Sequence, residues 1–119
     1  MDFGIQFRKW LKDNPQPTGA YELKQTKTDS ILFSCLEDNQ IDYALATQSS
    51  KGILIRVQGL SGEQDYINLV NVPSYVVIKF KSGFVIIPIQ NFLACKTKSK
   101  RRSLTFLEAE LISLKTIKL

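Results

Sequence analysis

Residues 19–27 read Gly-Ala-Tyr-Glu-Leu-Lys-Gln-Thr-Lys, and the expected fold is built on the strand that they form. The apolar and aromatic residues of this stretch predict a β-strand over residues 18–25. Successive side chains of a strand point to opposite faces, so Glu22 and Lys24 share one face while Tyr21 and Leu23 occupy the other. The sequence therefore places a carboxylate beside an ammonium group on one face of a strand.

The segments that flank this strand predict helices. Apolar residues recur at helical spacing over residues 2–12, and residues 36–48 show the same period less strongly. Ser34 is the expected N-cap of the second helix, with Glu37 as its capping-box partner. The strand is therefore expected to lie between two helices in the chain.

The second half of the chain is rich in strand-forming residues. Residues 75–80 are almost continuously apolar, as in a central strand, and Lys81-Ser82-Gly83 predicts a turn into a hairpin partner. The expected elements here are strands at 53–57, 65–70, 75–80 and 84–89, a turn at 59–64, a short helix from residue 90 and a capped helix from Thr105 to about Leu114. The pattern predicts an α/β (α+β) fold, with a mixed β-sheet flanked by helices.

Composition limits the class of protein. The 119 residues are 44% hydrophobic and 23% charged, which predicts a single globular domain over residues 1–119. Sixteen Lys and Arg against eleven Asp and Glu give a net charge of +5, which favours an anionic partner such as nucleic acid. No apolar run reaches the roughly 20 residues of a membrane span, and no signal-peptide pattern opens the chain. A cytoplasmic location is expected.

The residues that the chain lacks exclude several kinds of chemistry. There is no histidine, which excludes Ser-His and Cys-His nucleophile systems and zinc sites that contain histidine. Cys35 and Cys95 are far apart and lack metal-ligand spacing, so both are expected to be reduced core residues. Any catalysis must therefore use carboxylates, lysine and a metal ion.

A basic run precedes the last predicted helix. Five basic residues lie within 96–102 without an intervening acid, and they are Lys96, Lys98, Lys100, Arg101 and Arg102. Together with Lys27 they are candidates for contact with nucleic-acid phosphates, which would be independent of sequence. The alternative is a solvated loop without a ligand.

The Glu22-x-Lys24 pair has a chemical interpretation. A carboxylate can hold a divalent cation while a neighbouring lysine lies beside an attacking water and a phosphate, as phosphodiester hydrolysis requires. On an exposed strand the same pair could be only a solvated ion pair, worth about 0–1 kcal/mol. The context of the pair has to distinguish these two readings.

That context resembles a known family. The stretch Tyr21–Lys27 is followed by Phe33 and by Gln40-Ile41 in a helix, then by the apolar Tyr75–Ile78 strand and the Lys/Ser/Arg-rich segment 96–104. This order resembles the PD-(D/E)XK nuclease superfamily, and within it the RecU-type Holliday junction resolvases and their small phage relatives. The resemblance covers most of the chain. It implies a core like that of restriction endonucleases, and a bacterial or phage-infected host cell.

The resemblance also implies roles for particular residues. Glu22 would be a metal ligand, the backbone carbonyl of Leu23 would complete part of the metal shell, and Lys24 would orient the attacking water and stabilise charge on the phosphate. Gln40 would help to position the site from its helix, although it could equally be a solvated helix residue. Mg²⁺ suits these hard oxygen ligands, with Mn²⁺ as an alternative.

The second carboxylate departs from the family pattern. The family usually places an acidic residue before the Glu-x-Lys strand, where this chain offers only Asp2 and Asp13. Asp65, at the start of a later strand, is the better candidate if that strand pairs beside the Glu22 strand, and Asp13 is the alternative. Asp65 could also merely end a turn.

The resemblance predicts a structure-selective endonuclease. The expected activity is Mg²⁺-dependent hydrolysis of branched DNA, in particular of a four-way junction, by a homodimer whose two sites match the two-fold symmetry of the substrate. The alternatives are a nuclease that acts on linear DNA and a basic DNA-binding module without catalysis.

Overall fold

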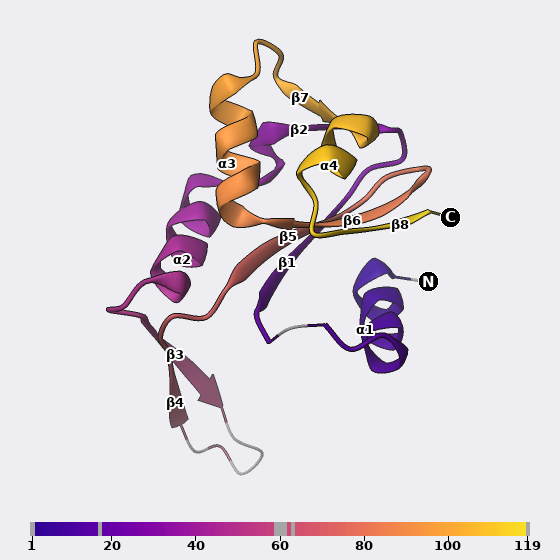
Figure 1. Cartoon of the computed structure of the whole chain (residues 1–119). Coiled ribbons are helices and arrows are strands. Elements are labelled where there is room, and N and C mark those ends of the chain that lie inside the picture. The colour runs from indigo at the N-terminus through magenta and orange to yellow at the C-terminus, as the bar shows by residue number, and fades with distance from the viewer. Residues whose placement is uncertain (1, 17, 59–61, 63, 119) are drawn as a thin grey trace.

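The centre of the molecule is a four-stranded mixed sheet. The computed structural model describes residues 2–16, 18–58, 62 and 64–118. The strand order is β1-β5-β6-β8, with β1 parallel to β5 and with β6 antiparallel to both of its neighbours (Figure 1). The strands are β1 (Ala20–Gln25), β5 (Ser74–Lys79), β6 (Gly83–Pro88) and β8 (Lys115–Lys118).

Helices cover both faces of this sheet. One face packs against α1 (Phe3–Asp13), and the other packs against α2 (Asp38–Gln48), α3 (Ile89–Lys98) and α4 (Phe106–Ile112). Figure 1 shows α3 and α4 on one side of the sheet and α1 on the other. The expected mixed sheet flanked by helices is confirmed, and the described chain is α+β. A core like that of restriction endonucleases stays a prediction.

The apolar character of β5 and β6 follows from this layering. Val76 and Ile78 of β5 belong to the cluster beneath α2, α3 and α4, whereas Val77 between them belongs to the cluster beneath α1. The same alternation applies to Ile86 and Ile87 of β6. Because both faces of these strands are covered along their middle, consecutive positions there favour apolar side chains, and the predicted central strand is confirmed.

Two smaller sheets complete the fold. One pairs β2 (Ser30–Leu32) with β7 (Ser103–Thr105), and the other is a hairpin of β3 (Ile53–Gln58) and β4 (Gln64–Leu69). A 3₁₀ turn, η1 (Phe33–Cys35), follows β2. The predicted turn at 59–64 joins β3 to β4, but residues 59–61 and 63 lie outside the described part of the chain.

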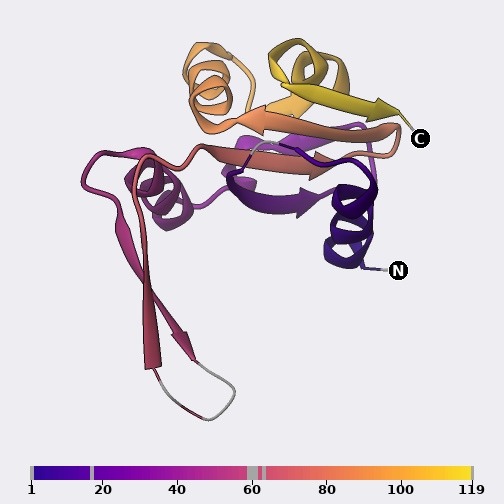
Figure 2. The same ribbon diagram turned by 60° about the horizontal axis from the view of Figure 1, so that its bottom comes forward.

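The β3–β4 hairpin projects away from the sheet (Figures 1 and 2). Its two ends meet at the body of the protein, where the backbone N–H groups of Asn71 and Val72 donate to the carbonyls of Ser49 and Thr47, each over 3.0 Å. Gly52 begins the hairpin with φ +69°, and a Cβ at this position would lie 2.3 Å from the carbonyl oxygen of Leu69. Glycine is therefore required at this entry point.

The helix starts confirm some of the expected caps. The Asp2 carboxylate accepts from the N–H of Gly4 at the start of α1, and Thr105 and Glu108 form the expected capping box of α4. The prediction that Ser34 caps the second helix is wrong, because Ser34 lies within η1 and Glu37 occupies the N-cap position of α2. Phe33, the first residue of this turn, is buried in the core.

Other differences concern short elements. Strands β7 and β8 were not expected, and the short helix predicted from residue 90 is part of the longer α3. Within the described residues no helix combines the length and the apolar character needed to cross a bilayer.

Candidate functional site

Strand β1 directs Glu22 and Lys24 toward α2. The side chains of Tyr21 and Leu23 pack in the cluster beneath α1, where the Tyr21 ring stacks on Tyr75 at 5.1 Å. Alternation along the strand then turns Glu22 and Lys24 to the opposite face. The packing of two apolar neighbours thus sets the direction of both polar side chains.

Three of the predicted site residues meet at one carboxylate oxygen. The Gln40 side chain donates from Nε2 to Oε1 of Glu22 over 2.9 Å, and the Lys24 ammonium lies 3.5 Å from the same oxygen. The Oε1 atom of Gln40 accepts the backbone N–H of Glu37 at the start of α2. Gln40 is therefore anchored at both ends and links the helix to the strand.

The lysine of this group is more enclosed than the carboxylate. The Lys24 side chain is 21% exposed and that of Glu22 is 43% exposed. Burial raises the pKa of the Cys35 thiol, and the ammonium groups of Lys24 and Lys96 partly oppose that rise. Lys24 thus lies near η1, with its charge only partly screened by solvent.

A cavity adjoins the Glu22 and Gln40 side chains. It has a volume of about 180 Å³ and lies between β1, α2 and the start of β5, with Tyr43 and Tyr75 among its lining residues. The cavity is mainly apolar, with the carboxylate of Glu22 among the polar groups at its wall. The site can therefore enclose an apolar part of a ligand beside the carboxylate.

The carbonyl of Leu23 points to an open sheet edge. The N–H groups of Ala20 and Thr26 donate to β5 and its flanks, at Pro73 and Lys79. In a parallel pair alternate residues bond to one neighbour, so Leu23 presents its N–H and carbonyl away from β5. Strand β1 is an edge strand of the described sheet, which leaves this carbonyl open to a ligand.

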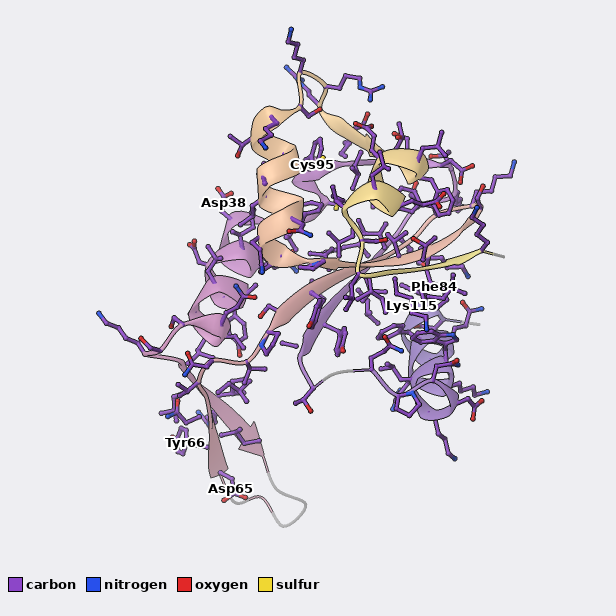
Figure 3. The ribbon with its side chains drawn as sticks, viewed as in Figure 1. Asp38, Asp65, Tyr66, Phe84, Cys95 and Lys115 are labelled. Atoms are coloured by element: carbon purple, nitrogen blue, oxygen red, sulfur yellow. The ribbon has the colours of Figure 1, made fainter. Side chains whose placement is uncertain are left out.

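The structure does not bring Asp65 to this group. Asp65 lies near the far end of the β3–β4 hairpin (Figure 3), where β4 pairs with β3 and not with β1. The expected pairing of the Asp65 strand beside the Glu22 strand is therefore wrong for a single chain. Asp13 ends α1, on the opposite side of the sheet. Among the described residues no three His, Cys, Asp or Glu side chains form a metal-binding cluster.

Some residues of the basic run contact other protein groups, and others are exposed to solvent. Lys96 and Lys98 occupy the last turn of α3, and Lys100 is exposed in the loop that follows. Arg101 donates to the Glu108 carboxylate over 2.7 Å, whereas Arg102 is exposed beside η1. The run is therefore only in part a solvated loop, since Glu108 holds one of its arginines.

Two further lysines lie near Lys27 and were not predicted. Lys79 and Lys81 line the same shallow cavity as Lys27, at the carboxyl ends of the parallel strands β1 and β5. Lys79 also donates to the Gln6 side chain over 2.7 Å. Ligands often bind at the shared carboxyl ends of parallel strands in α/β sheets, and this rule points to Lys79 and Lys81. The rule can be applied only once the pairing of β1 with β5 is known.

Replacement of Gln40 by alanine tests its anchoring role. The change removes the hydrogen bond to Glu22 and the cap on the Glu37 N–H, so the free energy of unfolding is expected to fall by about 1–2 kcal/mol. Urea denaturation measures this loss, with Asn39→Ala on the exposed side of the same helix as the control. Equal losses in the two variants would contradict the anchoring role.

Glu108 predicts a pH dependence of stability. Hydrogen bonds from the Thr105 backbone and hydroxyl, together with the charge of Arg101, hold the pKa of Glu108 below its usual value. A carboxyl group whose pKa is lower in the folded than in the unfolded protein stabilises the fold at pH values above its unfolded pKa, about 4.3 for glutamate. This stabilisation is lost as the pH falls through the pKa of the folded state. Thermal unfolding should therefore separate wild type from Glu108→Gln at pH 7 and bring them together below about pH 4. A difference that does not change with pH would contradict the assignment.

Comparisons with known proteins leave the site to be judged on its own geometry. Family models, curated proteins and solved structures were each searched, and none matches the chain.

Proposed function

We propose that the chain is a Mg²⁺-dependent endonuclease that cleaves DNA, with branched DNA and four-way junctions as its preferred substrates. The observation that supports this proposal is the group formed by Glu22, Lys24 and Gln40, in which an oriented carboxylate lies 3.5 Å from a partly enclosed ammonium. The net charge of +5 and the open part of the basic run favour a polyanionic substrate.

The ligands at this group suit Mg²⁺. This ion keeps several waters and is commonly held by one or two carboxylates together with substrate phosphates. Glu22 and the carbonyl of Leu23 are the hard oxygen donors for it, and Mn²⁺ accepts the same donors. When bound, the metal would lower the pKa of an attacking water and offset negative charge on the phosphate.

The protein residues have separate tasks in this proposal. Gln40 holds the Glu22 carboxylate in one orientation through its hydrogen bond of 2.9 Å. Lys24 would donate to a phosphate oxygen as charge develops on it, and its partial enclosure strengthens that interaction. Lys27 and the exposed part of the basic run would contact phosphates outside the cleaved bond.

The second carboxylate and the oligomeric state are linked. Asp65 stands on the projecting β3–β4 hairpin (Figure 3), which does not pair with the β1 strand that carries Glu22. It would serve a site only in a homodimer in which a second copy presents its hairpin, which agrees with the two sites that symmetric cleavage of a junction requires. Asp65→Asn tests this role, and Asp13→Asn tests the alternative carboxylate.

The experiment compares three labelled DNA substrates. A four-way junction, a linear duplex of matched sequence and a single strand are incubated with Mg²⁺ or with EDTA, using wild type, Lys24→Gln and the control Lys12→Gln, an exposed lysine on α1. Paired nicks in the junction alone, absent with EDTA and about 100-fold slower in Lys24→Gln, are expected. Equal cleavage of all three substrates would remove the preference for branched DNA. Salt-sensitive binding without metal-dependent cleavage would leave a DNA-binding module.

A further inference from the structure

A third cavity lies between η1 and the loop that joins α3 to β7. It has a volume of about 470 Å³ and combines an apolar part with a basic part. Leu32 and Phe33 contribute the apolar part, Ser34 adds a hydroxyl, and the basic part consists of Lys96, Arg101 and Arg102. No acidic side chain is among these lining residues.

The walls of this cavity are held in place by the fold. The Phe33 N–H donates to the carbonyl of Arg102 over 2.9 Å, directly beside the pairing of Leu32 with Ser103 in the β2–β7 ladder. The Phe33 ring packs edge-to-face on Phe92 in the core at 5.7 Å. A ligand would therefore meet a site whose two sides are already ordered, which lowers the entropic cost of binding.

The Leu32 side chain supplies the exposed apolar part of this surface. It is 57% exposed and lies beside the basic residues of the cavity. A phosphate alone would use the lysine and the arginines and leave this apolar surface without a partner. A nucleotide offers both parts, because its base has apolar faces and its phosphate carries the negative charge.

The base of such a nucleotide has to be unpaired. Within a duplex the faces of a base are covered by its neighbours, so only a base that has left the stack can pack on a side chain. The planar guanidinium of Arg102, which is exposed at the cavity, is suited to stack on the same ring or to bind the phosphate. Arg101 is less free, since Glu108 already holds its guanidinium.

The cavity and the Glu22–Lys24 group lie on the same side of the molecule. Phe33 lines the cavity and packs in the same core cluster as Val76 and Ile78, which are the register partners of Glu22 and Lys24. The cavity therefore adjoins the face of the sheet toward which Glu22 and Lys24 point. A DNA substrate bound at that group would meet this cavity, which favours nucleic acid over a short acidic peptide as the occupant.

We propose that this cavity binds a single unpaired nucleotide of the DNA substrate, with its base against Leu32 and its phosphate on Lys96 and Arg102. The inference rests on the proposed nuclease function and specifies its substrate class as DNA with an unpaired nucleotide at a branch. The site selects DNA in which base stacking is interrupted, since the bases of a continuous duplex are covered by their neighbours and cannot enter the cavity.

Fluorescence anisotropy in EDTA tests the proposal without cleavage. The probes are a fully paired four-way junction, the same junction with one unpaired thymidine at the branch, and a third junction in which that nucleotide is abasic. Wild type is expected to bind the thymidine junction about five- to tenfold more tightly than the abasic one. Leu32→Gln should abolish this preference and bind the fully paired junction as wild type does.

Matched variants separate the two parts of the cavity. Lys96→Gln should weaken binding to the thymidine and abasic junctions, since both present the phosphate of an extra nucleotide to the cavity, whereas Lys12→Gln on α1 should have less effect on them. Leu111→Gln changes an exposed leucine on α4 and should keep the preference for thymidine. Because Leu32 is exposed, its variant is expected to fold, and circular dichroism and thermal unfolding verify this.

The outcomes distinguish this proposal from that of the nuclease. An equal affinity of wild type for the thymidine and abasic junctions, or a preference that survives Leu32→Gln, would overturn the cavity assignment even if the junction is cleaved. Displacement of the probe by a peptide of Asp and Phe residues but not by thymidine monophosphate would assign the cavity to a protein ligand. Base-dependent binding without any metal-dependent cleavage would support the cavity and reject the nuclease.

Discussion

Replacement of Glu22 by glutamine is expected to abolish DNA cleavage while DNA binding persists. Loss of a residue that only orients a metal ligand typically costs about 10–100-fold in activity, so loss of the ligand itself should cost more than about 100-fold. Glutamine keeps the shape of the side chain and can still contact Gln40. It removes a negative charge near the phosphate, so affinity for DNA should be equal or higher.

Two measurements on one preparation check this result. Cleavage of a labelled junction is followed with Mg²⁺, and binding of the same junction is followed by anisotropy in EDTA. Asp42→Asn, on the exposed face of α2, is the control for loss of a carboxylate charge. Retention of more than about a tenth of the wild-type rate in Glu22→Gln would exclude Glu22 as an essential ligand.

Replacement of Phe92 by alanine is expected to have the largest effect on stability. The Phe92 side chain is fully buried in the core beneath α3, and its ring packs against Phe33. A change of this kind removes a large apolar surface and leaves a cavity, which costs about 3–5 kcal/mol. That is a large fraction of the roughly 5–15 kcal/mol that stabilises an ordinary domain.

Urea denaturation of Phe92→Ala and Leu111→Ala measures the effect of burial. Leu111 is 86% exposed on α4, so its truncation should change the free energy of unfolding by less than about 0.5 kcal/mol. If Phe92→Ala does not fold, Phe92→Leu provides a milder change at the same position. A loss below about 1 kcal/mol in Phe92→Ala would contradict the packing described for this core.

The main elements of the sheet follow from local patterns. The strand-forming residues within 20–25 and the apolar run of 75–80 each identify a strand, because each signal lies in a few consecutive residues. Helix α4 was predicted from Thr105 and Glu108, whose side chains satisfy backbone groups only three residues apart. Interactions of short range in the chain can be predicted in this way.

Elements that depend on distant partners could not be predicted. Strand β8 has the sequence Lys-Thr-Ile-Lys, which has little strand pattern and exists because β6 offers it a free edge. Strand β7 has three residues and depends on β2, which lies about 70 residues earlier in the chain. Helix α3 extends through a Lys-Thr-Lys sequence that suggested a loop.

The predictions for the candidate site divide in the same way, between contacts set by nearby residues and contacts set by distant ones. The proximity of Glu22 and Lys24 follows from strand alternation alone, and the contact with Gln40 agrees with the position expected for that residue. The predicted position of Asp65 was wrong. A hairpin sequence specifies which two strands pair with each other, but it does not specify where the hairpin lies relative to the central sheet. The bond between Arg101 and Glu108 likewise depends on how the α3–β7 loop folds over α4.

The closed base of the β3–β4 hairpin has a consequence for how this protein can evolve. Hydrogen bonds between Thr47 and Val72 and between Ser49 and Asn71 bring the two ends of the hairpin together, and neither of its strands pairs with the central sheet. Insertions, deletions or exchanges within the hairpin beyond Gly52 are therefore expected to leave the registers of the central sheet unchanged. Selection can alter the reach and chemistry of this appendage as a separate module while the body of the protein stays the same.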